Sequence, residues 1–220
     1  MCIVSLYTDY SSCFLLTHNR DEDYQRPSSN FTHHKLINNH QAEFPLDLLA
    51  NGTWILTSDQ FTTCMLNGAR EVHVYQPPYT KSRGTLPMEL LKHSSVDEYF
   101  SKLEAIGMQP FTQLIVSHNP LKVHILRWDG EQKDLETVED SRLVLSSSTL
   151  YSTKEKEMHK SVLQQNLSKP ITADKMAEKH RELLWKFDPM HPLVKTTSIT
   201  QVTYKSGKAE MSYQPIQYNL

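Results

Sequence analysis

The second residue of the chain is a cysteine, and the polar run Asn-Arg-Asp-Glu occupies residues 19–22. Initiator methionine is commonly removed before a small second residue, so Cys2 can carry a thiol and a free α-amine together. An α-amine has a pKa of about 8, so part of it is neutral at pH 7 and can act as the base for the neighbouring thiol. The start of the chain therefore predicts an N-terminal cysteine nucleophile.

Four further side chains fit that chemistry. Arg20 would stabilise the thiolate, and Asp21 or Glu22 would hold the amine or Arg20 in place. A tetrahedral intermediate also needs hydrogen-bond donors for its oxyanion, and the amide of Asn67 is the candidate donor. In the alternative interpretation, Cys2 only fills apolar space, as buried cysteines often do, and the charged run solvates a turn. Residue types and spacing alone leave both interpretations open.

A predicted hairpin brings these groups together. Residues 3–7 and 13–18 are rich in β-forming side chains, and the stretch between them is turn-like. Antiparallel pairing places the start of the first strand beside the end of the second. We therefore expect Cys2 to neighbour residues 19–22.

The remaining segments predict an α+β protein. Further strands are expected at 54–57, 61–66, 111–117, 122–128, 135–138, 142–146, 196–204 and 209–213. Helices are expected at 86–93, 95–106, 152–167 and 172–187, and irregular loops at 23–47 and 67–84. This order is not a βαβ alternation, so it favours two mainly antiparallel sheets with helices outside them. Neither a repeat nor a linker divides the sequence, which predicts a single domain over residues 1–220.

Composition excludes several classes of protein. A net charge of −2 over 220 residues gives no electrostatic basis for binding nucleic acid. No stretch reaches the roughly 18–20 apolar residues of a membrane span, and the N-terminus lacks the basic region of a signal peptide. Cys2, Cys13 and Cys64 form no Cys-x-x-Cys pair, and the eleven histidines have no metal-binding spacing. We expect a cytoplasmic protein without a metal or cofactor.

Several short motifs resemble the NRDE family, also called the transport-and-Golgi-organization protein family. They are Met-Cys-Ile-Val at the start, Asn-Arg-Asp-Glu at 19–22, Arg26-Pro27, Gly52-Thr53-Trp54, Leu66-Asn67 and Ser82-Arg83-Gly84, in that order. The resemblance implies an N-terminal-nucleophile-hydrolase-like fold, a four-layer αββα sandwich. It is similar to the cysteine branch that includes cholylglycine hydrolases and penicillin V acylases.

The resemblance also implies roles for individual residues. The implied catalytic residues are Cys2, Arg20, Asp21 and Asn67. The implied substrate-binding residues are Asn19, Glu22, Trp54, Arg83, Ser147 and Lys195. Ser147 stands where family members often have the Asn of a Ser-Asn pair. Lys195 opens a run that is Arg-Thr-Asn-Thr-like in the family, and lysine lacks the bidentate fork of arginine.

These observations support three hypotheses. The first is hydrolysis of a linear amide in a small-molecule substrate, with Cys2 as nucleophile. The second, motivated by Ser147 and Lys195, is a non-catalytic binding or trafficking protein for an apolar ligand such as heme or acyl-CoA. Histidines and the loops around Phe31, Phe44, Tyr75 and Tyr79 would contribute its pocket. The third is a structural protein that acts through partners. The sequence does not predict the oligomeric state.

Overall fold

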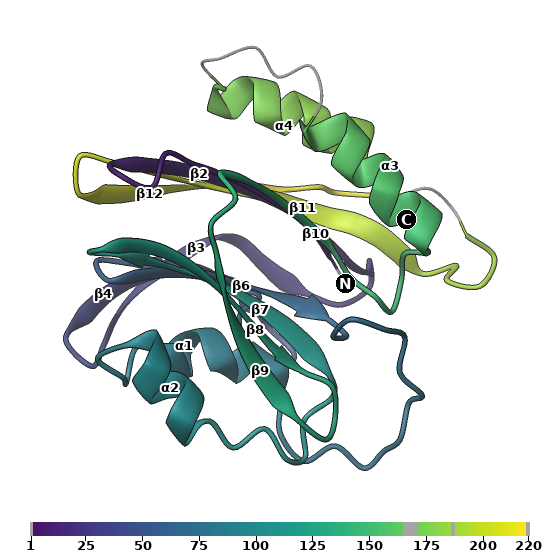
Figure 1. Ribbon diagram of the computed structural model, residues 1–220. Helices are drawn as coiled ribbons and strands as arrows, with labels where there is room; N and C mark the ends of the chain where they lie inside the picture. The colour runs from purple at the N-terminus through teal and green to yellow at the C-terminus, as the bar shows by residue number, and fades with distance from the viewer. Residues whose placement is uncertain (1, 165–170, 186–187, 219–220) are drawn as a thin grey trace.

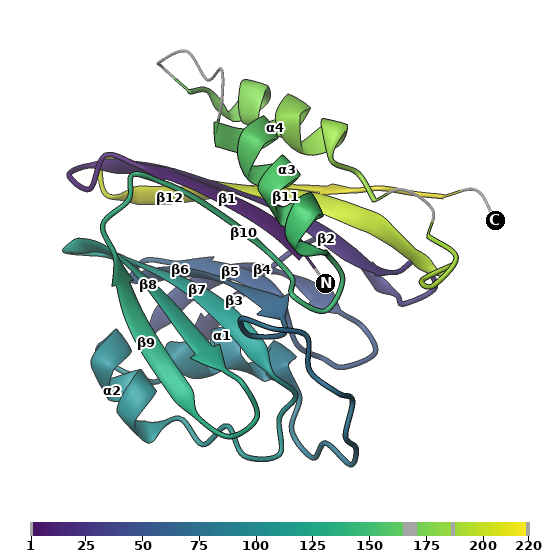
Figure 2. The ribbon, with the colours of Figure 1, turned by 45° about the vertical axis from the view of Figure 1, so that its right-hand side comes forward.

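The computed structural model describes residues 2–164, 171–185 and 188–218. Two antiparallel sheets are stacked face to face, and a pair of helices covers the outer face of each (Figure 1). The view in Figure 2 shows the same four layers. The expected four-layer α+β sandwich is confirmed.

The first sheet contains both ends of the chain. Its strand order is β10-β1-β2-β11-β12. The strands are β1 (Cys2–Thr8), β2 (Cys13–Asp23), β10 (Arg142–Ser146), β11 (Val194–Lys205) and β12 (Lys208–Pro215). Its outer face is covered by α3 (Thr153–Gln164) and α4 (Ala173–Glu182). The hairpin expected at the start of the chain is present as β1–β2, and the strands expected near the other end form a second hairpin, β11–β12.

The second sheet is a meander in chain order, from β3 to β9. Its strands are β3 (Ser28–Ile37), β4 (His40–Asp47), β5 (Ile55–Ser58), β6 (Phe61–Asn67), β7 (Phe111–His118), β8 (Leu121–Trp128) and β9 (Lys133–Val138). The 3-10 turn η1 (Arg83–Thr85) precedes α1 (Leu86–Leu90) and α2 (Val96–Lys102), which lie on the outer face (Figure 1).

The prediction of an irregular loop at 23–47 is wrong, because most of this segment forms the β3–β4 hairpin. The polar composition of β3 suits its position at the edge of the sheet, where much of it is exposed. Asn38 and Asn39 form the turn, and both have a positive φ, as the tight turns of hairpins require. The β4 strand ends at Asp47, a residue of the candidate site.

The strand expected at 142–146 exists, but it does not join the sheet of β9, the strand before it in the chain. It pairs with β1 in the other sheet, with Ser146 opposite Ile3. The sheet that a strand joins depends on its pairing with distant segments. Strand-forming composition predicts a strand but not its partners. This crossover places residue 147 beside Cys2.

Three of the four expected helices end earlier than predicted, and the end expected for the fourth lies outside the described residues. The helix α1 stops at Leu90, and α2 stops at Lys102, so the exposed Ile106 lies outside it. The helix α4 ends at Glu182, before the end expected near residue 187, and the end expected near residue 167 lies outside the described residues. These differences do not alter the layers.

The alternation of side chains along β1 separates two cores. Cys2, Val4 and Leu6 face the second sheet and pack with apolar side chains of β5, β6 and β7. Ile3 faces the opposite way and packs with apolar side chains of α3 and α4, among them Met176. The period of two that builds these cores also determines which polar side chains of β2 face the gap between the sheets.

Candidate active site

The β1–β2 hairpin places Cys2 directly opposite Arg20. Side chains of directly paired residues lie on the same face of a sheet, so both project toward the second sheet. Glu22, two residues further, lies on that face as well. Asn19 and Asp21 project to the opposite face, toward the helices. The hairpin therefore brings Arg20 and Glu22 to Cys2 and takes Asn19 and Asp21 away from it.

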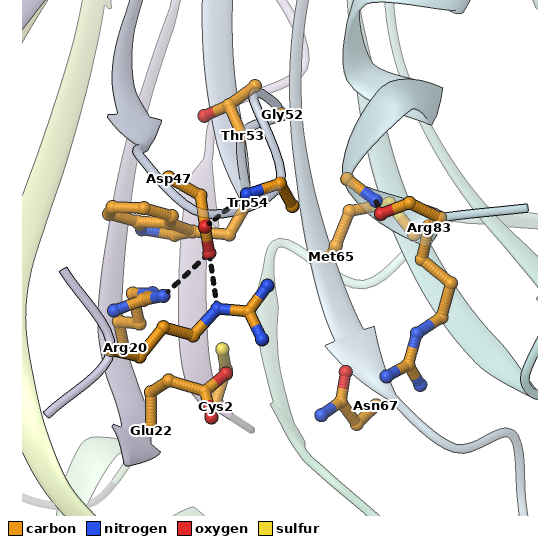
Figure 3. Close-up of a pocket in the computed structure, with 14 residues that line it drawn as sticks. Cys2, Arg20, Glu22, Asp47, Gly52, Thr53, Trp54, Met65, Asn67 and Arg83 are labelled. Carbon is orange, nitrogen blue, oxygen red and sulfur yellow. Dashed lines mark hydrogen bonds and ion pairs between the residues drawn. The ribbon is translucent and has the colours of Figure 1, made fainter. Parts of the chain in front are cut away.

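A cavity of about 110 Å³ opens beside Cys2, between the two sheets. Its principal lining residues are Cys2, Arg20, Glu22, Arg26, Asp47, Gly52, Trp54, Met65, Asn67 and Arg83. Figure 3 shows Cys2, Arg20 and Glu22 on one side, facing Asn67 and Arg83 on the other. The two sheets thus each contribute one wall, and the wall from the second sheet includes the end of β6.

Asp47 is the anionic centre of the cavity wall. Its carboxylate accepts hydrogen bonds from Nη2 of Arg20 at 3.0 Å and from Nε of Arg26 at 2.6 Å. It also accepts from the backbone N–H of Leu49 and Ala50, which fixes the turn after β4. The two guanidinium groups contribute to holding the pKa of Asp47 below its usual value. Asp47 therefore orients Arg20 beside Cys2.

Trp54 and Arg20 support each other. The guanidinium carbon of Arg20 lies 4.2 Å from the centre of the Trp54 ring, which is the geometry of a cation–π contact. Both side chains are buried. With Asp47 on one side and the indole on the other, Arg20 has a fixed position in the wall of the cavity.

Arg83 reaches the cavity because two backbone segments approach closely. The N–H of Thr53 donates to the carbonyl of Gly84 at 2.8 Å. A Cβ at Gly52 would lie only 2.6 Å from that carbonyl oxygen, so glycine is required there. The contact holds the segment before α1 against the end of β4 and directs Arg83 toward Asn67 (Figure 3).

The thiol of Cys2 is buried, and its pKa is raised by burial, while the charge of Arg20 lowers it. Desolvation is the larger effect, so the thiol stays protonated at pH 7 unless a base removes its proton. The thiols of Cys13 and Cys64 also have raised pKa values because of burial. Cys2 differs from them in facing a polar cavity with positive charge beside it.

Asn67 has the chemistry of an oxyanion donor. It ends β6 and lines the cavity opposite Cys2 (Figure 3). Its backbone carbonyl accepts a hydrogen bond from Oγ of Ser147 at 2.6 Å. Its side-chain amide has no hydrogen-bond partner within residues 2–164, 171–185 and 188–218. That amide is therefore available to a bound carbonyl group.

Asp21 does not line the cavity. Its carboxylate accepts hydrogen bonds from Tyr151 Oη and from Thr196 Oγ1, each at 2.6 Å. Burial raises its pKa to about 6. Asn19, on the same face, exchanges hydrogen bonds with His180, whose Nε2 lies 2.8 Å from the hydroxyl of Ser5. Both side chains anchor β2 to the segments that cover the sheet.

Ser147 and Lys195 lie near the site but do not line the cavity. The backbone N–H of Ser147 donates to the carbonyl of Cys2 at 2.9 Å, so this residue connects Cys2 with Asn67. The ammonium group of Lys195 lies 4.4 Å from the ring centres of both Tyr24 and Tyr218. Neither side chain takes the place of a second amide donor in the cavity.

Sequence reasoning did not identify Arg26, Asp47, Gly52 or Met65 as site residues. The role of Asp47 was missed because its segment was predicted to be a loop rather than a strand. Two signals were present in the sequence: polar and apolar residues alternate over 41–44, and an Asn-Asn pair precedes them. A hairpin predicted there would have given Asp47 a strand end, although not its partners.

Two comparisons relate the chain to known proteins. The family model described as Transport and Golgi organisation 2 matches residues 1–217. A crystal structure of the C2A mutant of conjugated bile acid hydrolase from Clostridium perfringens has a TM-score of 0.57 and 10% sequence identity, covering 100% of this chain and 97% of that chain. No curated protein matches the sequence. The structural likeness shows the N-terminal-nucleophile-hydrolase-like fold that the sequence motifs predicted.

Within the described residues, no helix has the length and apolar character needed to cross a membrane. The same residues hold no cluster of three or more His, Cys, Asp or Glu side chains arranged to bind a metal ion.

Proposed function

The chain belongs to the Transport and Golgi organisation 2 family, and from that premise we propose that it is an N-terminal cysteine hydrolase of linear carbon–nitrogen (amide) bonds. One observation carries the proposal. Cys2, at the first residue of β1, faces a cavity that also presents the amide of Asn67 and the guanidinium of Arg20. A nucleophile, an oxyanion donor and a fixed positive charge are thus together in one small space.

Removal of Met1 would complete the catalytic unit. The freed α-amine of Cys2 accepts the thiol proton, and the sulfur attacks the carbonyl carbon of the amide. The Nδ2–H of Asn67 donates to the oxygen that becomes negative. The intermediate collapses, the α-ammonium protonates the departing amine, and a thioester remains on Cys2. Water then attacks the thioester and releases the acid and the thiol.

The other residues act by position. We assign to Arg20 the stabilisation of the thiolate and to Glu22, which lines the cavity beside Cys2, the orientation of the α-amine. Trp54 supports Arg20. Asp21 and Asn19 act from the opposite face of β2 by anchoring it, and Ser147 acts by binding the backbone of Cys2 and Asn67. Lys195 has no contact through which we can assign it a step.

The binding alternative gains less support from this cavity. Its volume of about 110 Å³ is well below the roughly 300–1,000 Å³ of typical ligand pockets. Its walls carry three arginines and two carboxylates, a poor environment for a porphyrin. Phe31, Phe44, Tyr75 and Tyr79 do not line it: Phe44 belongs to the core beneath α1 and α2, and Phe31 and Tyr75 are exposed. The hydrolase is therefore the function that we propose.

The proposal is tested with a panel of short N-acyl anilides whose hydrolysis releases a coloured amine. We expect turnover by the mature protein, none by Cys2→Ala, and a fall in kcat of roughly 10²–10³ for Asn67→Ala. Cys13→Ser, which changes a thiol outside the cavity, is the control and should keep full activity. Turnover that survives Cys2→Ala would exclude the proposed nucleophile.

A further inference from the structure

The charges of the cavity do not balance. Arg20, Arg26 and Arg83 line it together with only Glu22 and Asp47. Asp47 binds both Arg20 and Arg26. Under the proposed mechanism Glu22 is engaged by the α-amine, which adds a further positive charge whenever it holds a proton. Arg83 is then the guanidinium without a carboxylate.

The contacts of Arg83 lead to the same conclusion. Its Nη1 donates to the carbonyl of Pro110 at 2.9 Å, and no carboxylate lies within 4.0 Å of it among the described residues. A guanidinium has five N–H donors in a planar fork. Burial lowers the pKa of Arg83 to about 10, so it remains charged at pH 7. The protein thus keeps a half-buried positive charge, and among the described residues only one of its N–H groups has a protein hydrogen-bond partner.

Arg83 lies where a substrate would meet it. It is next to Asn67 and faces Cys2 across the cavity (Figure 3). Cys2 and Glu22 are among the groups whose charges act on Arg83. The cavity is small, with a volume of about 110 Å³. A group bound to Arg83 therefore lies within a few bonds of the carbonyl carbon that Cys2 attacks.

We propose that Arg83 is an anion-binding residue that selects amide substrates with a carboxylate close to the scissile bond. This inference rests on the proposed hydrolase function. The planar fork pairs with both oxygens of a carboxylate, while Asn67 stays free for the scissile carbonyl oxygen. A neutral amide of the same size leaves Arg83 unpaired and is bound less well.

The first test uses two alkylating probes and needs no hydrolysis. Iodoacetate and iodoacetamide are nearly the same size, but only iodoacetate carries a carboxylate. We measure the rate constant of each at Cys2 and take the ratio, which cancels changes in thiol reactivity. Arg83→Gln should lower the iodoacetate-to-iodoacetamide ratio about ten-fold, and Arg83→Lys less. Arg70→Gln, at an exposed ion pair with Asp134, should leave the ratio unchanged.

The second test uses pairs of anilides with a carboxylate or its primary amide, placed on the acyl side in one pair and on the amine side in the other. Arg83→Gln should raise KM for the carboxylate member of one pair and spare its neutral member. The pair that responds identifies the side of the scissile bond that Arg83 binds. The thermal unfolding of each variant is measured alongside, and Arg83→Lys replaces Arg83→Gln if the latter does not fold.

The outcomes separate the two proposals. An alkylation ratio that is the same in the wild type and in both Arg83 variants overturns the anion-binding role, whether or not amides are hydrolysed. If the ratio depends on Arg83 but the protein hydrolyses no amide, the anion-binding role stands and the hydrolase function is excluded. Equal hydrolysis of charged and neutral substrates also contradicts the selection that we propose.

Discussion

At the scale of single residues, Asp47 is the carboxylate on which the position of Arg20 depends. It is buried and balances two guanidinium groups, one of them on the fully enclosed Arg20. Asp47→Asn would leave both arginines without a counter-charge, and breaking a buried pair in this way costs about 3–5 kcal/mol. We predict a loss of that size in the free energy of unfolding, measured by urea titration.

The control is Glu210→Gln, which removes a carboxylate from an exposed pair with Lys208. Exposed pairs contribute little to the free energy of unfolding, so this variant should unfold almost like the wild type. Equal losses for the two variants would show that Asp47 is not the charge centre that holds Arg20 in place.

The sequence predicted the residues of the site unevenly, for a physical reason. Cys2 and Arg20 are close because a short hairpin pairs them, and local pairing can be derived from composition and turns. The grouping of Asp21 with Arg20 neglected the alternation that sends neighbouring side chains to opposite faces. Asp47 reaches the site only through the neighbouring sheet, and no local pattern encodes such a contact.

At the scale of elements, the contact between Gly52 and Gly84 fixes the wall that carries Arg83. A Cβ on Gly52 would lie 2.6 Å from the carbonyl oxygen of Gly84, a backbone atom that cannot rotate away. Gly52→Ala should therefore separate the two segments and break the bond from Thr53 to Gly84. We predict a destabilisation of about 1–3 kcal/mol, in the range of other overpacked sites, measured by thermal unfolding.

Gly84→Ala is the matched control from the other side of the same contact. Its Cβ would meet its nearest neighbour, the Cα of Gly52, at an ordinary 3.5 Å. This variant should retain the wild-type stability within about 0.5 kcal/mol. If Gly84→Ala were as destabilising as Gly52→Ala, the close approach would not be the reason for glycine at 52.

The elements themselves were predicted where their patterns were strong. Most strands of both sheets were expected near their observed bounds, because β-forming runs are separated by clear turns. The exceptions are β3 and β4, which lie in the segment expected to be a loop. The strand β3 lies at the sheet edge, has little apolar alternation and is held by its ladder with β4. The sheet that β10 joins was also missed, because it depends on a partner more than a hundred residues away, as the pairing of Ile3 with Ser146 illustrates.

At the scale of the whole molecule, buried histidines make stability depend on pH. Burial lowers the pKa of His18 and His180 to about 3 and that of His118 to about 4. In the unfolded chain each would titrate near 6.5, so at pH 5 the unfolded state binds protons that the folded state does not. The free energy of unfolding is therefore highest above pH 6.5 and falls on acidification. At pH 5 the loss is roughly 2 kcal/mol per histidine.

Asp21 acts in the opposite direction over part of the same window. Its pKa is about 6 in the folded protein and lower in the unfolded chain, so the folded state binds the extra proton. Protonation of Asp21 between pH 7 and pH 5 thus increases the free energy of unfolding by roughly 1 kcal/mol. The histidines outweigh it, and we predict a net loss of several kcal/mol in urea unfolding at pH 5 compared with pH 7.

His18→Phe tests the cause directly. Neither ring nitrogen of His18 has a hydrogen-bond partner among the described residues, so the change removes a titrating group and no bond. The variant should lose roughly 2 kcal/mol less than the wild type between pH 7 and pH 5. An unchanged pH dependence would mean that His18 is not the buried neutral group described here.

The central claim is that Cys2 is an activated N-terminal nucleophile. The most direct measurement is the intact mass of the purified protein before and after brief treatment with iodoacetamide, with the modified residue located. We predict that Met1 is absent and that Cys2 reacts about ten-fold faster than Cys13, although Cys13 is the more exposed thiol. Retention of Met1, or a Cys2 that reacts no faster than Cys13, would contradict the claim.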